Sequence, residues 1–67
     1  MDGMPEYLKV ALVADLLHVH PSTVKTWAKQ GKLAVATLPS GHIRVATAAV
    51  LQMGVSEDEI MQQLTKE

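Results

Sequence analysis

Hydroxyl and ammonium side chains recur over residues 22–29 at spacings that would place them on one arc of a helix. They are Ser22, Lys25, Thr26 and Lys29. Lysines bind phosphate oxygens, and short hydroxyl side chains near the start of a helix can donate hydrogen bonds to phosphates and to base edges. The pattern therefore predicts contact with DNA. The alternative is a helix face that is only solvated, which is the commoner situation for a lysine-bearing face.

A second pair of candidate contacts follows in a segment where polar and apolar residues alternate. His42 and Arg44 alternate with Ile43 and Val45, so a strand here would carry the polar pair on one face. An imidazole and a guanidinium on that face could reach a phosphate or the minor groove. The alternative is an ordinary hairpin with one solvated arginine.

Two short helices joined by a tight turn are predicted to position the first set of contacts. An apolar stripe at three-and-four spacing predicts the first helix over residues 9–17. The stripe consists of Val10, Val13, Ala14 and Leu17. His18 follows where the chain must turn sharply, a position that favours a positive φ, and histidine tolerates this better than most residues other than glycine.

The second helix is predicted over residues 21–30. Pro21 suits its first position, because the N–H that proline lacks would have no partner inside the helix. Val24, Trp27 and Ala28 share the face opposite the cations, and Gly31 suits the left-handed residue that ends a helix. Two helices with this turn have the layout of a helix-turn-helix, whose second helix enters the DNA major groove.

A β-hairpin is predicted after the second helix. Residues 33–38 and 43–45 alternate in the manner of strands, and Pro39, Ser40 and Gly41 between them are typical of a turn. The hairpin is a candidate wing that would carry His42 and Arg44. The expected fold is mainly α with a small β-hairpin wing, a winged helix-turn-helix followed by a short C-terminal helix.

Two further helices are predicted in the last third of the chain. We expect Thr47 to cap a helix over residues 48–53 that Gly54 ends. Ser56 and Glu59 have the spacing of a capping box for the last helix. Its expected apolar side comprises Ile60, Met61 and Leu64, with Val55 and Ile60 spaced as a hydrophobic staple.

The last helix has two interpretations. The favoured one is that it packs on the core of its own domain. In the other, residues 55–67 contact a neighbouring protomer, and the acidic first turn of Glu57, Asp58 and Glu59 meets a basic surface there. Either way, residues 1–67 are expected to form a single winged helix-turn-helix domain.

Composition excludes several classes of function. The 67 residues include no cysteine, so disulfides and thiolate zinc sites are excluded, and the three histidines have no partners at metal-ligand spacing. They are His18, His20 and His42. No apolar run approaches about 18 residues and no signal-peptide pattern is present, which favours a soluble cytoplasmic protein without a membrane partner. No catalytic constellation is recognisable, and neither an enzyme nor a cofactor is expected.

The charges are segregated along the chain. The net charge is −1, yet the segment 25–44 contains no acid and carries +4, which leaves −5 on the remainder. Its cations are Lys25, Lys29, Lys32 and Arg44. The basic stretch thus coincides with the predicted DNA-contacting elements, although four cations predict modest, salt-dependent affinity for a single copy.

The sequence resembles a known family over about residues 8–53. The run LKVALVADLLHVHPSTVKTWAKQGKL, followed by SGHIRV and AAVLQM, is similar to the winged helix-turn-helix of phage excisionases and of the MerR and BldC regulators. The most specific parts are WAK followed by GKL, and GH with Arg44 in the wing. Lys9 stands where a Thr or Ser cap is usual, Ile43 replaces a wing arginine, and the segment 46–49 lacks the usual charges.

The resemblance implies roles for individual residues. The groove-facing positions of the recognition helix correspond to Ser22, Thr23, Lys25, Thr26 and Lys29. His42 and Arg44 correspond to the wing residues that approach the backbone or the minor groove, and Trp27 to a packing position.

The resemblance also implies a role in the cell. The 14 residues after Met53 are too few for the coiled coil and effector region of MerR regulators. The expected role is that of an excisionase, which binds repeated double-stranded DNA sites cooperatively and bends them so that a tyrosine or serine integrase excises. Self-association on DNA, head to tail, would accompany it. The alternatives are a BldC-like transcription regulator and a DNA-binding adaptor similar to the phage terminase small subunit.

Overall fold

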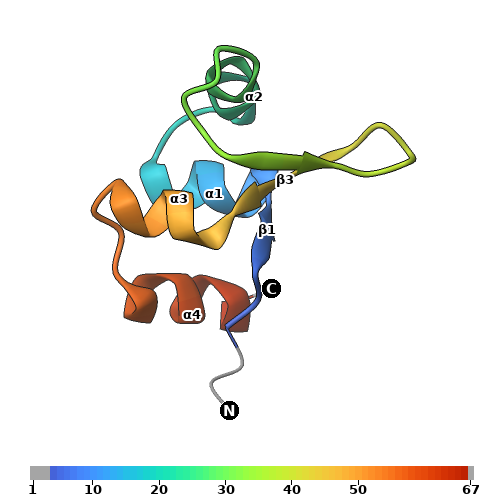
Figure 1. Ribbon diagram of the computed structural model, residues 1–67. Helices are drawn as coiled ribbons and strands as arrows, with labels where there is room; N and C mark the ends of the chain where they lie inside the picture. The colour runs from blue at the N-terminus through green and yellow to red at the C-terminus, as the bar shows by residue number, and fades with distance from the viewer. Residues whose placement is uncertain (1–3, 67) are drawn as a thin grey trace.

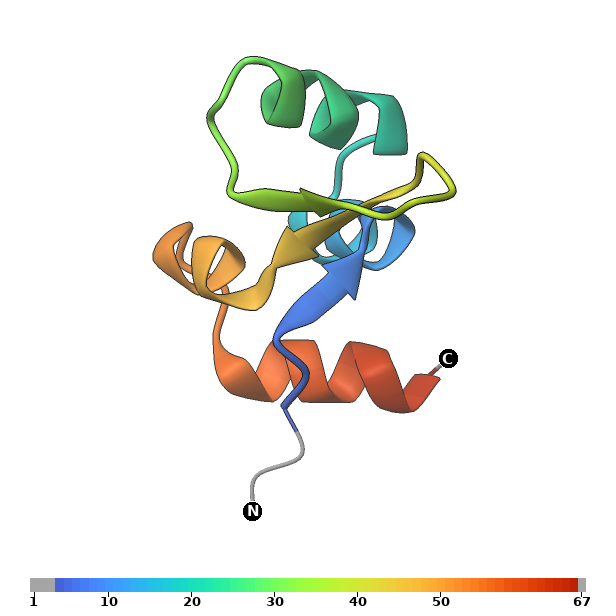
Figure 2. The same cartoon turned by 45° about the vertical axis from the view of Figure 1, so that its right-hand side comes forward.

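A computed structural model describes residues 4–66, which form four helices around a three-stranded sheet (Figure 1). The elements are β1 (Tyr7–Lys9), α1 (Val10–Leu17), α2 (Pro21–Lys29), β2 (Val35–Thr37), β3 (Ile43–Ala46), α3 (Thr47–Gln52) and α4 (Glu57–Lys66). Both ribbon views place α2 on one side of the sheet and α4 on the other, with α1 and α3 between them (Figures 1 and 2). The predicted fold class, a winged helix-turn-helix with a C-terminal helix, is confirmed.

The turn between α1 and α2 has the predicted geometry. α1 begins at Val10, one residue later than expected, because Lys9 has extended backbone and belongs to β1. His18 ends the helix in the left-handed region, with φ 58° and ψ 43°, as its place in the sequence predicts. The N–H of Val19 then donates to the carbonyl oxygen of Ala14 at 3.0 Å, which closes the end of the helix.

The second helix begins at Pro21, as predicted, and ends at Lys29, one residue earlier than expected. Its first turn is capped by the side chain of His20, whose Nδ1 accepts a hydrogen bond from the N–H of Ser22 at 3.2 Å. Gly31 follows with φ 77°, the left-handed conformation expected after a helix. Val24 is fully buried and Trp27 is half-buried against the core, so the predicted inner face of α2 is confirmed at these two residues, whereas Ala28 is half-buried outside the core cluster.

The sheet contains one strand more than the sequence predicted. The predicted hairpin is present as β2 and β3, in which Val35 lies opposite Val45, and Gly41 turns the chain with φ 93°. β1 pairs with the other edge of β3 in an antiparallel register, and Leu8 lies opposite Val45 in the core. The strand order is β1-β3-β2, so the wing is continuous with the strand that leads into α1.

The predicted cap of α3 is wrong. Thr47 is the first residue of the helix, and its Oγ1 donates a hydrogen bond to the carbonyl oxygen of Pro5 at 2.7 Å. Its backbone N–H donates to the carbonyl oxygen of Glu6 at 2.9 Å. Thr47 is therefore a buried link between the segment before β1 and the start of α3, where Ala46 provides no side-chain cap. Gly54, with φ 100°, follows the end of this helix as predicted.

The last helix packs on the same chain, as its favoured interpretation expects. The capping box is present, because Glu59 Oε1 accepts from the N–H of Ser56 at 3.0 Å and Ser56 Oγ accepts from the N–H of Glu59 at 3.2 Å. Val55 and Ile60 are both buried in the core cluster. The expected apolar side is wrong at Met61, which is 37% exposed, whereas Leu64 is half-buried and packs on the core.

Candidate nucleic-acid interface

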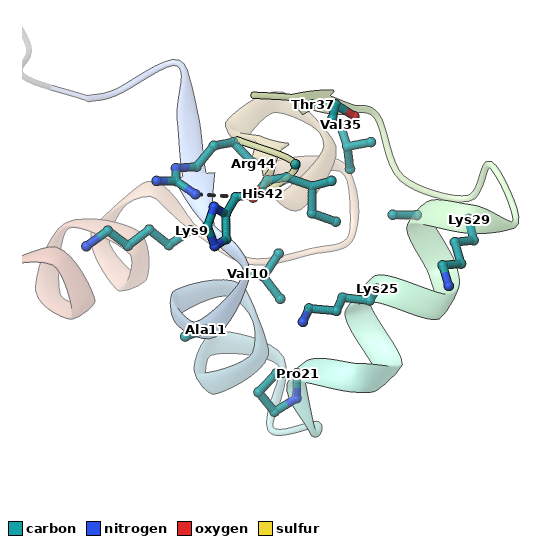
Figure 3. Close-up of a pocket in the computed structure, with 13 residues that line it drawn as sticks. Lys9, Val10, Ala11, Pro21, Lys25, Lys29, Val35, Thr37, His42 and Arg44 are labelled. Carbon is teal, nitrogen blue, oxygen red and sulfur yellow. Dashed lines mark hydrogen bonds between the residues drawn. The ribbon is translucent and has the colours of Figure 1, made fainter. Parts of the chain in front are cut away.

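A groove of about 660 Å³ separates α2 from the wing and from the junction of β1 with α1 (Figure 3). Apolar side chains from all three parts line it, including Val10 of α1, Ala28 of α2 and Ile43 of β3. Figure 3 shows Lys25 and Lys29 on the α2 side of this groove. The same elements that form the core therefore fix the distance between α2 and the wing.

Cations line the groove on both sides. Those on the side opposite α2 are Lys9 and Arg44, accompanied by His42 (Figure 3). No carboxylate is among the lining residues. The positive potential of the groove is thus not offset locally, and it favours a polyanion.

Four of the seven contact residues predicted from the sequence line this groove. They are Lys25, Lys29, His42 and Arg44. The structure does not bring the hydroxyl residues of α2 into it: Ser22 and Thr26 are exposed outside the groove, and Thr23 is half-buried. They lie over the first turns of α2, the part that contacts base edges in helix-turn-helix proteins.

Two of these hydroxyls are engaged within the helix. Thr26 Oγ1 donates to the carbonyl oxygen of Ser22 at 2.9 Å, and Ser22 Oγ lies 2.9 Å from Nδ1 of His20. Because His20 Nδ1 accepts from the backbone N–H of Ser22, the ring proton of a neutral imidazole is on Nε2. His20 is exposed, so this N–H is an additional donor at the start of α2.

The wing holds its polar residues in place through local hydrogen bonds. Ser40 Oγ lies 2.9 Å from Nδ1 of His42, and Nη1 of Arg44 donates to the carbonyl oxygen of Ile43 at 3.3 Å. Arg44 is half-buried, whereas His42 is exposed. The guanidinium therefore starts from a restrained position and retains further N–H donors for a ligand.

Lys9 is the cation of the groove that the sequence analysis does not assign to the site. It lies directly opposite Arg44 in the register of β1 and β3. The segment 7–9 is too short for alternation to predict a strand, and only its pairing with β3 brings Lys9 beside the wing. One feature of the sequence points to this residue: a lysine occupies a position where the family resemblance predicts a Thr or Ser cap.

Comparison with known proteins identifies the family. A family model described as a helix-turn-helix domain matches residues 7–53. The chain belongs to the helix-turn-helix domain family. This family includes excisionase-like DNA-binding proteins, and membership indicates that the chain binds DNA. No curated protein sequence matches the chain significantly.

The matched region of this helix-turn-helix domain begins with β1 and ends at Met53, so it contains the whole groove and excludes α4. Such domains are typically non-enzymatic. Within residues 4–66, no group of three or more potential metal ligands is assembled. None of the helices in this range is long and apolar enough to cross a membrane.

Proposed function

We propose that this helix-turn-helix protein is an architectural DNA-binding protein of the excisionase type. The recognition helix α2 enters the major groove and the β2–β3 wing contacts the adjacent backbone or minor groove. Base edges and phosphates are contacted by Ser22, Thr23, Lys25, Thr26 and Lys29 of α2 and by His42 and Arg44 of the wing. Several copies bind adjacent repeats and hold a bend that directs an integrase toward excision.

The observation that carries this proposal is the groove with cations on both sides and no carboxylate in its lining. A DNA backbone that leaves the major groove beside α2 would meet Lys25 and Lys29 first and the wing next. These contacts are independent of DNA sequence and fix the position of the helix on DNA, while Ser22 and Thr26 of α2 are exposed and can approach base edges.

The weak binding expected of one copy favours several copies bound side by side on DNA. The chain has six lysines and arginines in all, and few of them line the groove, so a single copy neutralises few phosphates. Bending a site of 20–30 base pairs costs on the order of 1–6 kcal/mol. A row of cooperating copies supplies that free energy more readily than one copy can.

Charge complementarity supports a head-to-tail arrangement of these copies. Glu57 and Asp58 are exposed in the first turn of α4, and both ribbon views place that turn on the opposite side of the molecule from the tip of the wing (Figures 1 and 2). An acidic end on one copy can therefore approach the basic side of the next one while both remain on DNA.

Binding to DNA with one site and with tandem sites tests the proposal, with the bend measured on each. We expect weak binding to one site, cooperative binding to tandem sites, and a bend that increases with each copy. The paired variant Glu57→Gln/Asp58→Asn should reduce cooperativity and leave single-site affinity unchanged. Glu6→Gln is the matched control, because Glu6 is also exposed but lies before β1.

A recombination assay then separates the proposed role from the alternatives. Addition of the protein to its integrase and an attachment-site substrate should raise the yield of excision. Cooperative binding at promoter repeats without an effect on excision would favour the BldC-like regulator. Specific capture of a terminase large subunit would favour the packaging adaptor.

A further inference from the structure

Lys9 and Arg44 are direct cross-strand neighbours. Lys9 is the last residue of β1, and it lies opposite Arg44 in the antiparallel register with β3. Residues opposite each other in such a pair project to the same face, with Cβ atoms about 4.5–5.5 Å apart. Two like charges in that arrangement repel each other, so the free protein has an unfavourable interaction at this point.

Neither cation is neutralised within the described part of the chain. Lys9 is exposed and has no carboxylate partner among residues 4–66, and the guanidinium of Arg44 hydrogen-bonds there only to the carbonyl oxygen of Ile43. His42 is two residues from Arg44 on the same side of the strand, and Figure 3 shows its ring beside the other two side chains. Three nitrogen-bearing side chains thus lie side by side where the described part of the chain provides no anion.

We propose that Lys9, His42 and Arg44 bind one phosphate of the DNA backbone between them. This inference rests on the proposed DNA-binding function and adds Lys9 to its contacts. A guanidinium can donate two parallel hydrogen bonds to a phosphate, and an ammonium adds a compact charge from the neighbouring strand. A bound phosphate converts the repulsion between the two cations into attraction for both.

The position of this phosphate site distinguishes it from the contacts made by α2. Figure 3 shows the apolar side chain of Val10 between Lys9 on one side and Lys25 on the other. The phosphates bound at the two sides are therefore different ones. DNA is favoured over an acidic peptide as the occupant, because the chain belongs to a domain family that binds DNA and α2 of this domain forms the other side of the groove.

Fluorescence anisotropy with a labelled single-site duplex at several salt concentrations tests the inference. We compare the wild type with Lys9→Met, Arg44→Met and the double variant; methionine keeps an unbranched apolar stem. Lys66→Met is the matched control, since Lys66 is an exposed lysine that does not line the groove. Circular dichroism of each free variant verifies its fold.

We expect Lys9→Met and Arg44→Met each to weaken binding by about three- to tenfold, with Lys66→Met unchanged. Because one phosphate is shared, the double variant should lose less than the product of the two single losses. Its slope of log K against log salt should fall by about one. Two separate phosphates would instead give a multiplicative loss and a fall of about two, which overturns the shared site.

Two other results would also overturn the inference. If Lys9→Met binds the single site with wild-type affinity, Lys9 does not contact DNA there. Because Lys9 is exposed, this variant should fold, and the test stands even if Arg44→Met does not fold. A loss seen only on tandem sites would assign Lys9 to a carboxylate of a neighbouring copy. Failure of the proposed DNA-binding function is distinguishable, because Lys25→Ala and Lys29→Ala would then leave DNA affinity unchanged as well.

Discussion

The Nδ1 atom of His20 accepts a hydrogen bond from the backbone N–H of Ser22 at 3.2 Å, so an imidazole caps the recognition helix. Asn, Asp, Ser and Thr are the usual residues at this position. A histidine cap functions only while Nδ1 has a free lone pair. The start of α2 therefore depends on a ring that also presents an N–H to solvent.

Replacement of this cap should destabilise the free protein. His20→Ala removes the acceptor, and we expect the free energy of unfolding to fall by about 0.5–1 kcal/mol. His20→Asn should retain the cap and most of the stability. Urea unfolding of both variants measures the difference. Equal stability of the alanine and asparagine variants would show that the hydrogen bond contributes nothing in solution.

Trp27 is expected to act through packing. It is half-buried on the inner side of α2 and packs on the core cluster. Full truncation of a buried tryptophan costs about 3–5 kcal/mol, and partial exposure reduces the expected loss for Trp27→Ala to about 2–3 kcal/mol. Thermal unfolding followed by circular dichroism measures it. A variant with wild-type stability that fails to bind DNA would instead place Trp27 in the DNA interface.

Lys25 is expected to contribute one phosphate contact from α2. Lys25→Ala should weaken binding to every duplex to a similar degree and lower the slope of log K against log salt by about one. Lys66→Ala, at the other end of the fold, serves as the control. If the Lys25 variant kept the wild-type slope, Lys25 would make no phosphate contact and the DNA backbone would not pass along this side of the groove.

Ile60 lies outside the region matched by the family model, and we expect it to stabilise the core of the domain. Its side chain is fully buried, and it belongs to the same core cluster as Val13 and Val24. Ile60→Ala should cost about 2–5 kcal/mol, because it leaves a cavity in a small core. Met61→Ala is the matched control. Met61 is the exposed neighbour of Ile60, so its truncation should lower the free energy of unfolding far less. Similar losses from both would mean that the helix is only loosely held in solution.

Local features of the fold were predictable because their causes are local. The apolar stripe of α1, the proline at the start of α2, the left-handed His18 and the capping box of α4 each depend on residues within one or two turns. The same holds for the hairpin, whose turn residues lie between its strands. The predicted Lys25, Lys29, His42 and Arg44 therefore lie around one groove.

The features that escaped prediction depend on contacts distant in the sequence. Strand β1 exists because Leu8 pairs with Val45, and this pairing alone brings Lys9 into the groove. Thr47 has the residue type of a cap, but its hydroxyl donates a hydrogen bond to the carbonyl oxygen of Pro5, which is distant in the sequence. Met61 fits the apolar pattern together with Ile60, yet the orientation of α4 on α1 buries Ile60 and leaves Met61 exposed.

The position of Ile60 has a consequence for how this domain is delimited. The part that the family shares ends at Met53, but the cluster that holds α1 and α2 together includes Val55 and Ile60 beyond that point. The region that the family model matches is thus shorter than the region that contributes to the buried core. A fragment cut at the family boundary would retain every side chain that lines the groove and lose two buried side chains of the core on which α1 and α2 pack.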